Sequence, residues 1–410
     1  MGETREETGK EENEQVVLKV LEALRQASND LKRKPSLGKD ASAIKALLEL
    51  ETEADNILSS DPNLSRLSCH LSNLKTLVDN LQQSQGYSLR SFLRRRVSNH
   101  EISRIAGSIE IEIQAWIDRE SVENLVSSLH GSVSEEEKIK LLIQFESRVS
   151  QGFDRGLQDS LLKSKVFSEL ECILCDSKCS KRIREQSALA MAALVRFNKD
   201  VFVGQVLMGP TVRALVSMGS NSSIHVLCSL IKSIRSPLVD EIESNGEIPK
   251  IISLLSVEDL SIRVTAMDCI LEIGYFGRKE AIEAMLEEGL IKKLVELQRS
   301  ELGGDLIDMG RFDENANNGV SVGGVQVEAK GRKESRESKF LETHPFASCV
   351  ARFAVQLEVG EGLRQREKRA FKQEILRRIR EACVSDAEAA TIVAEVEYIT
   401  TSRRPFQPVS

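Results

Sequence analysis

Apolar residues recur at an interval of about 40 residues through the middle of the chain. When Ile183, Ser223 and Ile262 are set in register, apolar residues coincide at two further positions: Met191, Ile231 and Ile270, and then Leu194, Ile234 and Ile273. The three- and four-residue spacing within each set predicts one amphipathic helix per unit. A unit of this size holds two or three helices and cannot bury its apolar face alone. The pattern therefore predicts an all-α fold in which the units stack as a solenoid.

The repeats are predicted to extend over residues 121–300. A second apolar segment precedes each of the three helices, beginning at Val166, Thr211 and Ile248. An irregular first repeat is expected from Ser121, because Ser134 and a glutamate three residues later form a capping-box pattern before another apolar run. The number of such units predicts about five stacked repeats.

The N-terminal part of the chain has a different organisation. Residues 1–13 are mostly charged and are predicted to be disordered. Residues 14–120 contain four segments with leucine or isoleucine at helical spacing, and turn-forming residues such as Pro35, Gly38 and Gly86 separate them. Four amphipathic helices with short polar connections predict a helical bundle that precedes the solenoid.

The apolar period stops after residue 300. Residues 301–344 are rich in glycine, asparagine and charge, so they are predicted to form a disordered insertion. Residues 345–383 are predicted to hold the last repeat and a basic capping helix over Leu363–Cys383. Residues 384–410 are expected to form a short helix, around Ala387–Val396, and a polar tail.

Composition narrows the function classes. The chain has 410 residues, a net charge of −7 and only 4% aromatic residues, which suits helix packing by aliphatic side chains and disfavours nonspecific nucleic-acid binding. The acidic start does not resemble an export signal, and the longest apolar run, Ala188–Val195, is too short for a transmembrane segment. Eight cysteines without an extracellular signature suit a reducing compartment. We therefore expect a protein of the cytoplasm, with the nucleus as the alternative.

The segment Asn245–Gly274 resembles the armadillo repeat. Gly246, Ile248 and Pro249 match the start of the second helix in that family, and Ala266 matches the small residue of the third helix. A helical bundle followed by such repeats is similar to plant U-box ubiquitin ligases and their armadillo-only relatives. The resemblance implies a groove, lined by the third helices, that binds a partner protein or peptide.

Two departures limit what this resemblance implies. The few residues between Trp116 and the first repeat leave no room for a U-box, so ligase activity is not expected. Importin-type armadillo proteins grip basic peptides with asparagine and tryptophan. The corresponding asparagine positions here hold Ala193, Ser233 and Glu272, and no repeat contains tryptophan. We expect a partner to contact exposed residues that flank these three positions.

The cysteines at 172, 175 and 179 form the most suggestive group of potential ligands. Three thiolates at these spacings could begin a zinc or iron–sulfur site, but no fourth cysteine or histidine lies near them. Their spacing favours instead one buried helix face. The five histidines are scattered, and no phosphate-binding loop or nucleophile motif occurs. The sequence therefore predicts no catalytic, cofactor or metal site, and no enzyme activity.

Two basic segments could carry regulation or binding. Ser98 follows three arginines, Arg94–Arg96, in a pattern typical of basophilic kinase sites, although an unmodified solvated loop explains the same residues. Residues 364–380 hold eight basic and two acidic side chains beside an apolar stripe. This helix could bind an acidic protein or an anionic membrane, or it could simply cap the last repeat.

The leading prediction is a noncatalytic scaffold or adaptor that binds a partner protein through the repeat groove. A first alternative is a regulator in a ubiquitin-ligase pathway that lacks its own U-box. A second alternative is a peripheral membrane tether that uses the basic C-terminal helix. The sequence identifies neither the partner nor the oligomeric state.

Overall fold

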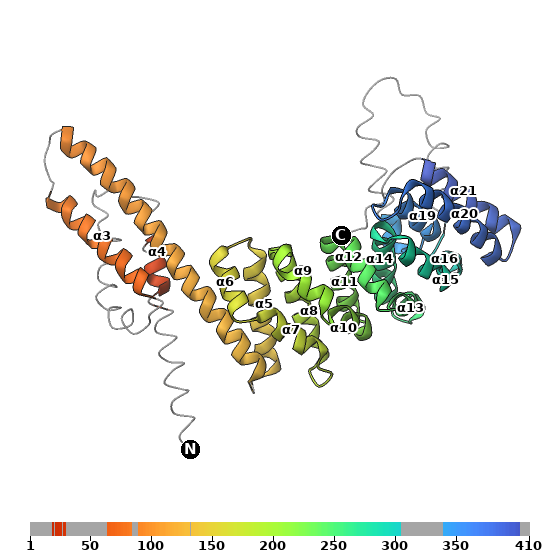
Figure 1. The fold of residues 1–410 in the computed structure, drawn as a ribbon, viewed down its shortest axis with the longest axis horizontal. Coiled ribbons are helices and arrows are strands. Elements are labelled where there is room, and N and C mark those ends of the chain that lie inside the picture. The colour runs from red at the N-terminus through yellow and green to blue at the C-terminus, as the bar shows by residue number, and fades with distance from the viewer. Residues whose placement is uncertain are drawn as a thin grey trace, which may run out of the picture. The chain divides into compact units, whose positions relative to one another are not determined.

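The computed structural model describes residues 19, 21–26, 28–29, 64–83, 89–131, 133–304 and 339–401 (Figure 1). The regular elements of these residues are helices, without strands, as the all-α prediction requires. The chain divides into two compact units, one formed by Met1–Gly131 with Asp154–Val166 and the other by Ser132–Phe153 with Phe167–Ser410. The predicted disorder of residues 1–13, the predicted helices between residues 30 and 63, and the tail after Thr401 lie outside the described residues.

The first unit contains α3 (Ser65–Gln83), α4 (Leu89–His130) and α6 (Arg155–Lys163). Its core joins leucines of α3 to isoleucines and Trp116 of α4, and α6 packs against α4 as well. The predicted boundary between residues 120 and 121 is wrong, because α4 continues to His130. The buried residues Val122, Leu125 and Leu129 extend its apolar stripe, and the helix ends just before Gly131.

The helices of the second unit follow one another in regular order. They are α5 (Glu135–Ser150), α7 (Val166–Cys175), α8 (Lys181–Phe197), α9 (Lys199–Met208), α10 (Thr211–Met218), α11 (Asn221–Ile234), α12 (Ser236–Ser244), α13 (Ile248–Ser253), η2 (Leu254–Ser256), α14 (Leu260–Phe276), α15 (Lys279–Glu287), α16 (Leu290–Arg299), α19 (Cys349–Val359), α20 (Gln365–Ala382) and α21 (Asp386–Thr401). From α9 to α19 they form successive groups of three, which is the arrangement of an armadillo-type solenoid.

The same N-cap opens each central third helix. Ser180, Ser220 and Asp259 accept hydrogen bonds from the backbone N–H three residues further on. Those N–H groups belong to Ile183, Ser223 and Ile262, the residues that define the repeat register. Each cap satisfies one of the N–H groups left unpaired at a helix start. The 40-residue period is therefore confirmed at the level of single hydrogen bonds.

The third helices pack side by side and form what we call the ladder, in the order α5, α8, α11, α14 and α19. Its interior consists of fully buried aliphatic side chains, among them Leu194, Ile231 and Ile270. Each ladder helix therefore depends on both neighbours for its burial, as expected for stacked repeats.

The insertion interrupts a repeat and does not follow one. The first two helices of that repeat are α15 and α16, and α19 packs on α14 in the place of the third helix. Three backbone hydrogen bonds fix the ends of the insertion, from Gly304 N to Gln298 O, from Phe346 N to Leu302 O and from Ser348 N to Gly304 O. The predicted limits of 301–344 are therefore too wide, and the remainder, 305–338, lies outside the described residues.

The C-terminal helices close the ladder. Helix α20 confirms the predicted basic helix and packs against α16, while α21 packs against α19 and α20. Helix α21 is longer than predicted, since it continues past Val396 to Thr401, and its buried residues Ala389, Ile392 and Val396 lie on the predicted part. Among the described helices, none alone has the length and hydropathy needed to cross a bilayer; α9 and α10 reach these limits only together and bend by 70° where they meet.

Candidate partner-binding surface

One side of the central ladder carries residues, most of them polar, that are only partly covered. We call this surface the ladder face. It consists of Leu189 and Arg196 on α8, Ser229, Lys232 and Ser233 on α11, and Asp268, Glu272 and Tyr275 on α14. Counted from the first member on each helix, the other members follow three, four or seven residues later, so they lie on one side of that helix.

Contacts between neighbouring repeats hold the ladder face together. Arg196 Nη1 on α8 donates a hydrogen bond to Ser229 Oγ on α11, over 3.2 Å. Lys232 Nζ on α11 lies 3.4 Å from Glu272 Oε1 on α14. The side chain of Lys232 remains 52% exposed, whereas that of Glu272 is only 13% exposed. Such a pair adds at most about 1 kcal/mol of stability, so its main effect is to orient charge on the surface.

The two carboxylates of the ladder face are partly desolvated. Burial raises the pKa of Asp268 above its ordinary value, and the positive charges of Arg352, Lys232 and His225 oppose this shift. Burial likewise raises the pKa of Glu272, against the attraction and hydrogen bond of Lys232. A carboxylate that has lost water gains more than an exposed one from a new hydrogen-bond donor. Asp268 and Glu272 are one helical turn apart, which suits recognition of an extended segment.

The three residues marked by the sequence do not share one environment. Ala193 is only 1% exposed, so it cannot itself contact a partner, and on α8 the predicted contact falls to the exposed residues that flank it. It lies in the middle of α8, whose residues are covered because α5 and α11 pack on either side. Ser233 is half-buried and donates to Ser229 O within its own helix. Of the three, only Glu272 carries a charged group, and this group pairs with Lys232.

Sequence reasoning missed the residues that give the ladder face its charge. Lys232 directly precedes Ser233, and Asp268 lies one turn before Glu272, so the repeat register could have identified both. Arg352 could not be found in this way, because it lies beyond the insertion on α19. Its side chain is 5% exposed, and its Nη1 donates to Pro345 O over 2.6 Å.

The three-cysteine segment does not form the buried helix face that its spacing suggested. Cys172 and Cys175 are exposed at the end of α7, and Cys179 lies beyond that helix and is half-buried. Desolvation raises the pKa of both Cys175 and Cys179, so neither thiol is activated. Across the residues that the structure describes, no three histidine, cysteine or acidic side chains are grouped so as to hold a metal ion.

Ser98 lies within α4, so this segment is a helix and not the loop of the alternative interpretation. The side chains of Ser98 and of the arginines before it are outside the described set. Phosphorylation of Ser98 therefore remains a prediction from the sequence.

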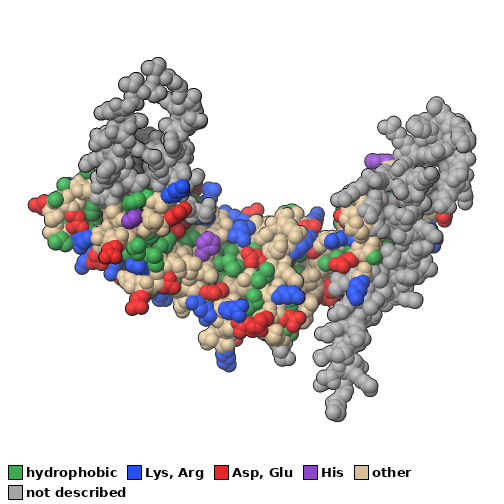
Figure 2. All heavy atoms as spheres, turned by 180° about the vertical axis from the view of Figure 1, so that it is seen from behind, with side chains coloured by type: hydrophobic (Ala, Val, Ile, Leu, Met, Phe, Trp, Pro, Cys, Tyr) green, Lys and Arg blue, Asp and Glu red, His purple; other side chains and the backbone are tan. Residues whose placement is uncertain are grey.

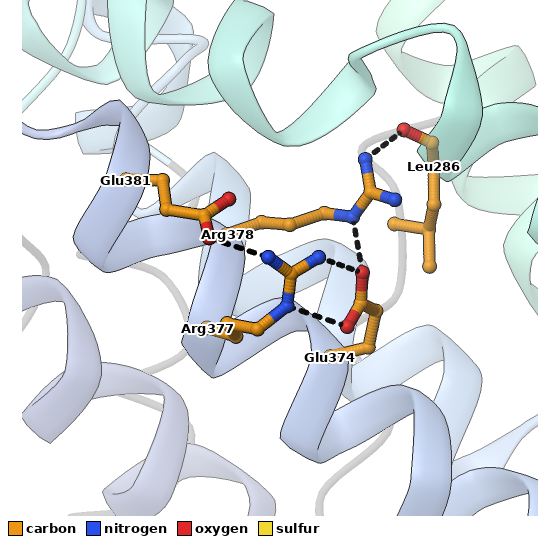
Figure 3. Close-up of polar contacts among 5 residues, drawn as sticks. All are labelled: Leu286, Glu374, Arg377, Arg378 and Glu381. Atoms are coloured by element: carbon orange, nitrogen blue, oxygen red, sulfur yellow. Dashed lines mark hydrogen bonds and ion pairs between the residues drawn. The ribbon is translucent and has the colours of Figure 1, made fainter.

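The basic helix α20 uses part of its charge in contacts within the protein (Figure 3). Glu374 pairs with Arg377 and with Arg378, and Arg378 also donates to Leu286 O at the end of α15. Hydrogen bonds from the two arginines lower the pKa of Glu374 to about 2. Lys368 is buried, and its Nζ donates to Glu358 O and Gly360 O at the end of α19, over 2.7 and 2.8 Å.

The apolar stripe of α20 is also occupied. Phe371, Ile375 and Ile379 are buried, and the helix packs against α16 and α21. These side chains therefore cannot enter a membrane while the fold is intact. The contacts favour the capping interpretation of α20 over that of a membrane tether.

Comparisons with known proteins add little beyond the fold. No family model matches the chain, and no curated protein matches its sequence. Solved structures that resemble it include a designed armadillo repeat protein, with a TM-score of 0.41 and 15% identity over 69% of this chain and 100% of that one. A designed armadillo repeat protein in complex with a (KR)4 peptide has a TM-score of 0.38 and 16% identity, over 68% of this chain and 99% of that one. An engineered protein has a TM-score of 0.41 and 17% identity, over 94% of this chain and 98% of that one. Scores this low do not bear on what this chain binds, and the plant U-box relationship stays a prediction.

Proposed function

We propose that the protein is a noncatalytic scaffold that binds a segment of a partner protein across the ladder face. The proposal is carried by one observation: Lys232, Asp268 and Glu272, from two stacked repeats, place charged groups side by side on a continuous surface of helices. Stacked repeats present such a surface over a longer distance than a compact domain does, which suits extended ligands.

The charges indicate the chemistry of the partner. Asp268 and Glu272 are partly desolvated, so a partner that offers cationic or amide donors would improve their hydrogen bonding. Lys232 and Arg196 flank them and would repel a uniformly basic segment. The surface in Figure 2 likewise interleaves Lys and Arg with Asp and Glu. This mixture favours a protein segment of mixed polarity over a polyanion such as nucleic acid.

A charge-swap series tests the proposal in the full-length chain. Glu272→Lys places two cations together and should weaken capture of the partner. The double variant Lys232→Glu, Glu272→Lys restores the ion pair but exchanges the positions of the charges. If the ladder face binds the partner, the double variant should recover thermal stability without recovering binding.

A second inter-repeat ion pair provides the matched control. Arg278 Nη1 lies 2.9 Å from Asp240 Oδ2, where α12 meets α15, and both side chains are partly exposed. The swap Asp240→Lys, Arg278→Glu should leave partner capture unchanged because these helices are not part of the ladder. Equal capture by wild type and by both ladder-face variants would remove the ladder face as the binding site.

A further inference from the structure

Two buried cysteines meet between neighbouring ladder helices. Cys228 on α11 and Cys269 on α14 are 5% and 0% exposed, and neither is in a disulfide. Cys228 Sγ lies 3.9 Å from the backbone oxygen of Thr265, one turn before Cys269, and the neighbouring thiol of Cys269 is the largest cause of the raised pKa of Cys228. The pair therefore lies where α11 and α14 pack directly against one another.

We propose that Cys228 and Cys269 are a site of reversible disulfide formation that crosslinks the third helices of two adjacent repeats. A disulfide requires Cβ atoms about 3.5–4.5 Å apart, and hence two backbones in close approach. Cysteine is small enough to permit this approach, and Cys228 Sγ already lies against the turn of α14 that precedes Cys269, so a local adjustment of the two side chains is needed.

A peroxide is the oxidant that suits so enclosed a pair, because it is small and uncharged. The thiolate of Cys228, the more exposed partner, attacks one peroxide oxygen and becomes a sulfenic acid as hydroxide leaves. The thiolate of Cys269 then attacks the sulfenic sulfur, forms the S–S bond and expels a second hydroxide. The two thiols thus lose two electrons and two protons, and the peroxide is reduced to two molecules of water.

The same surroundings make the reaction slow. The hydrogen bond with Cys269 is the largest cause of the high pKa of Cys228, followed by burial and then by the negative charges of Asp268 and Glu272. Because the thiolate is the nucleophile, little of the reactive form is present near neutral pH. The pair should therefore respond to sustained oxidation and be distinguishable from the exposed thiols of Cys172 and Cys175.

The crosslink would act directly beneath the ladder face. Lys232 lies one turn after Cys228, and Glu272 lies about one turn after Cys269, so a disulfide would fix the spacing of the helices that carry this ion pair. Closing the loop between the two cysteines also restricts the unfolded chain. We expect the oxidised protein to melt higher by roughly 5–10 °C.

The experiment uses a full-length variant in which the five more accessible cysteines become serine: Cys69, Cys172, Cys175, Cys179 and Cys383. Three thiols remain, and Cys349 is the internal control because it is fully buried and bonds to Leu294 O. The folded protein is treated with hydrogen peroxide, unreacted thiols are blocked, and peptides are mapped without reduction. The proposal predicts one linkage, between Cys228 and Cys269, with Cys349 still reduced and with full reversal by dithiothreitol.

Cys228→Ser and Cys269→Ser, each in that background, should abolish both the linkage and the rise in melting temperature. The proposal is overturned if Cys228 and Cys269 remain reduced in the folded protein, or are each oxidised singly without a linkage. A linkage of either to Cys349 would overturn it as well. The peptide map alone decides the outcome, even if one serine variant folds poorly.

Discussion

The substitution Gly274→Ala tests whether α19 really completes the ladder. A Cβ at position 274 on α14 would lie 3.1 Å from Phe353 Cε2 and 3.3 Å from Phe353 Cδ2 on α19. Phe353 is 0% exposed and so has little freedom to move. Alanine gains about 1 kcal/mol over glycine in a helix, whereas overpacking a core costs about 1–3 kcal/mol. We expect Gly274→Ala to leave the free energy of unfolding unchanged or to lower it, by up to about 2 kcal/mol.

Gly204→Ala is the matched control, because a Cβ there meets no atom within 4 Å on the exposed side of α9. It should raise the free energy of unfolding by about 0.5–1 kcal/mol. The unfolded-state effect is common to both variants, so their difference isolates the clash with Phe353, about 1–3 kcal/mol. Urea denaturation followed by circular dichroism measures this difference from the midpoints at equal slopes. If Gly274→Ala stabilises the protein as much as Gly204→Ala does, α19 does not pack on α14.

Three further substitutions test individual contacts. Ala266, which is 0% exposed on α14, should not tolerate phenylalanine: Ala266→Phe is expected to cost about 1–3 kcal/mol and to lower the melting temperature, whereas Pro249→Ala at an exposed first turn should have little effect. Asp268→Asn should raise stability at pH 7, because the raised pKa of Asp268 means that its charged form disfavours folding. The gain should vanish below about pH 3.8, where the wild-type carboxyl group is protonated in both the folded and the unfolded state. A pH series of thermal melts measures this gain, and the same gain at every pH would contradict the prediction. Lys368→Met should cost about 1–3 kcal/mol by leaving Glu358 O and Gly360 O without their donor. The exposed Arg369→Met serves as its control, and equal melting of the two variants would dismiss the capping role.

The sequence predicted the repeat register well because the same local chemistry recurs. Ile183, Ser223 and Ile262 were aligned from apolar periodicity, and each proves to be the residue whose N–H is bound by a helix cap. Such caps depend only on residues three positions apart, so they can be recognised from the amino-acid sequence alone.

The ends of helices and of the repeat array were harder to predict from the sequence than the repeat register. The stripe of α4 continues through Val122 to Leu129 without a glycine or proline, so nothing local marks a boundary near residue 120. The place of α19 in the ladder was hidden because the insertion separates it from α16 and removes the 40-residue period.

The candidate site was predicted only in part. Glu272 was identified from the repeat register, but its exposure depends on helices that pack from both sides, and Ala193, identified from the same register, is buried. The spacing of Cys172 and Cys175 predicted a buried helix face, but both side chains are exposed at the C-terminal end of α7. Burial of this kind is a tertiary property and has no strong signal in spacing alone.

Site-specific photo-crosslinking tests the proposed binding mode most directly. A photoreactive residue is placed at Ser229, in the middle of the ladder face, and in a separate variant at Met208, which is 90% exposed on α9 and outside the ladder. Both full-length proteins are irradiated in cell extract, and crosslinked partners are identified by mass spectrometry. If the ladder face binds the partner, the partner crosslinks at position 229, is lost with Glu272→Lys, and does not crosslink at position 208. A partner that crosslinks at position 208 and not at 229 would contradict it.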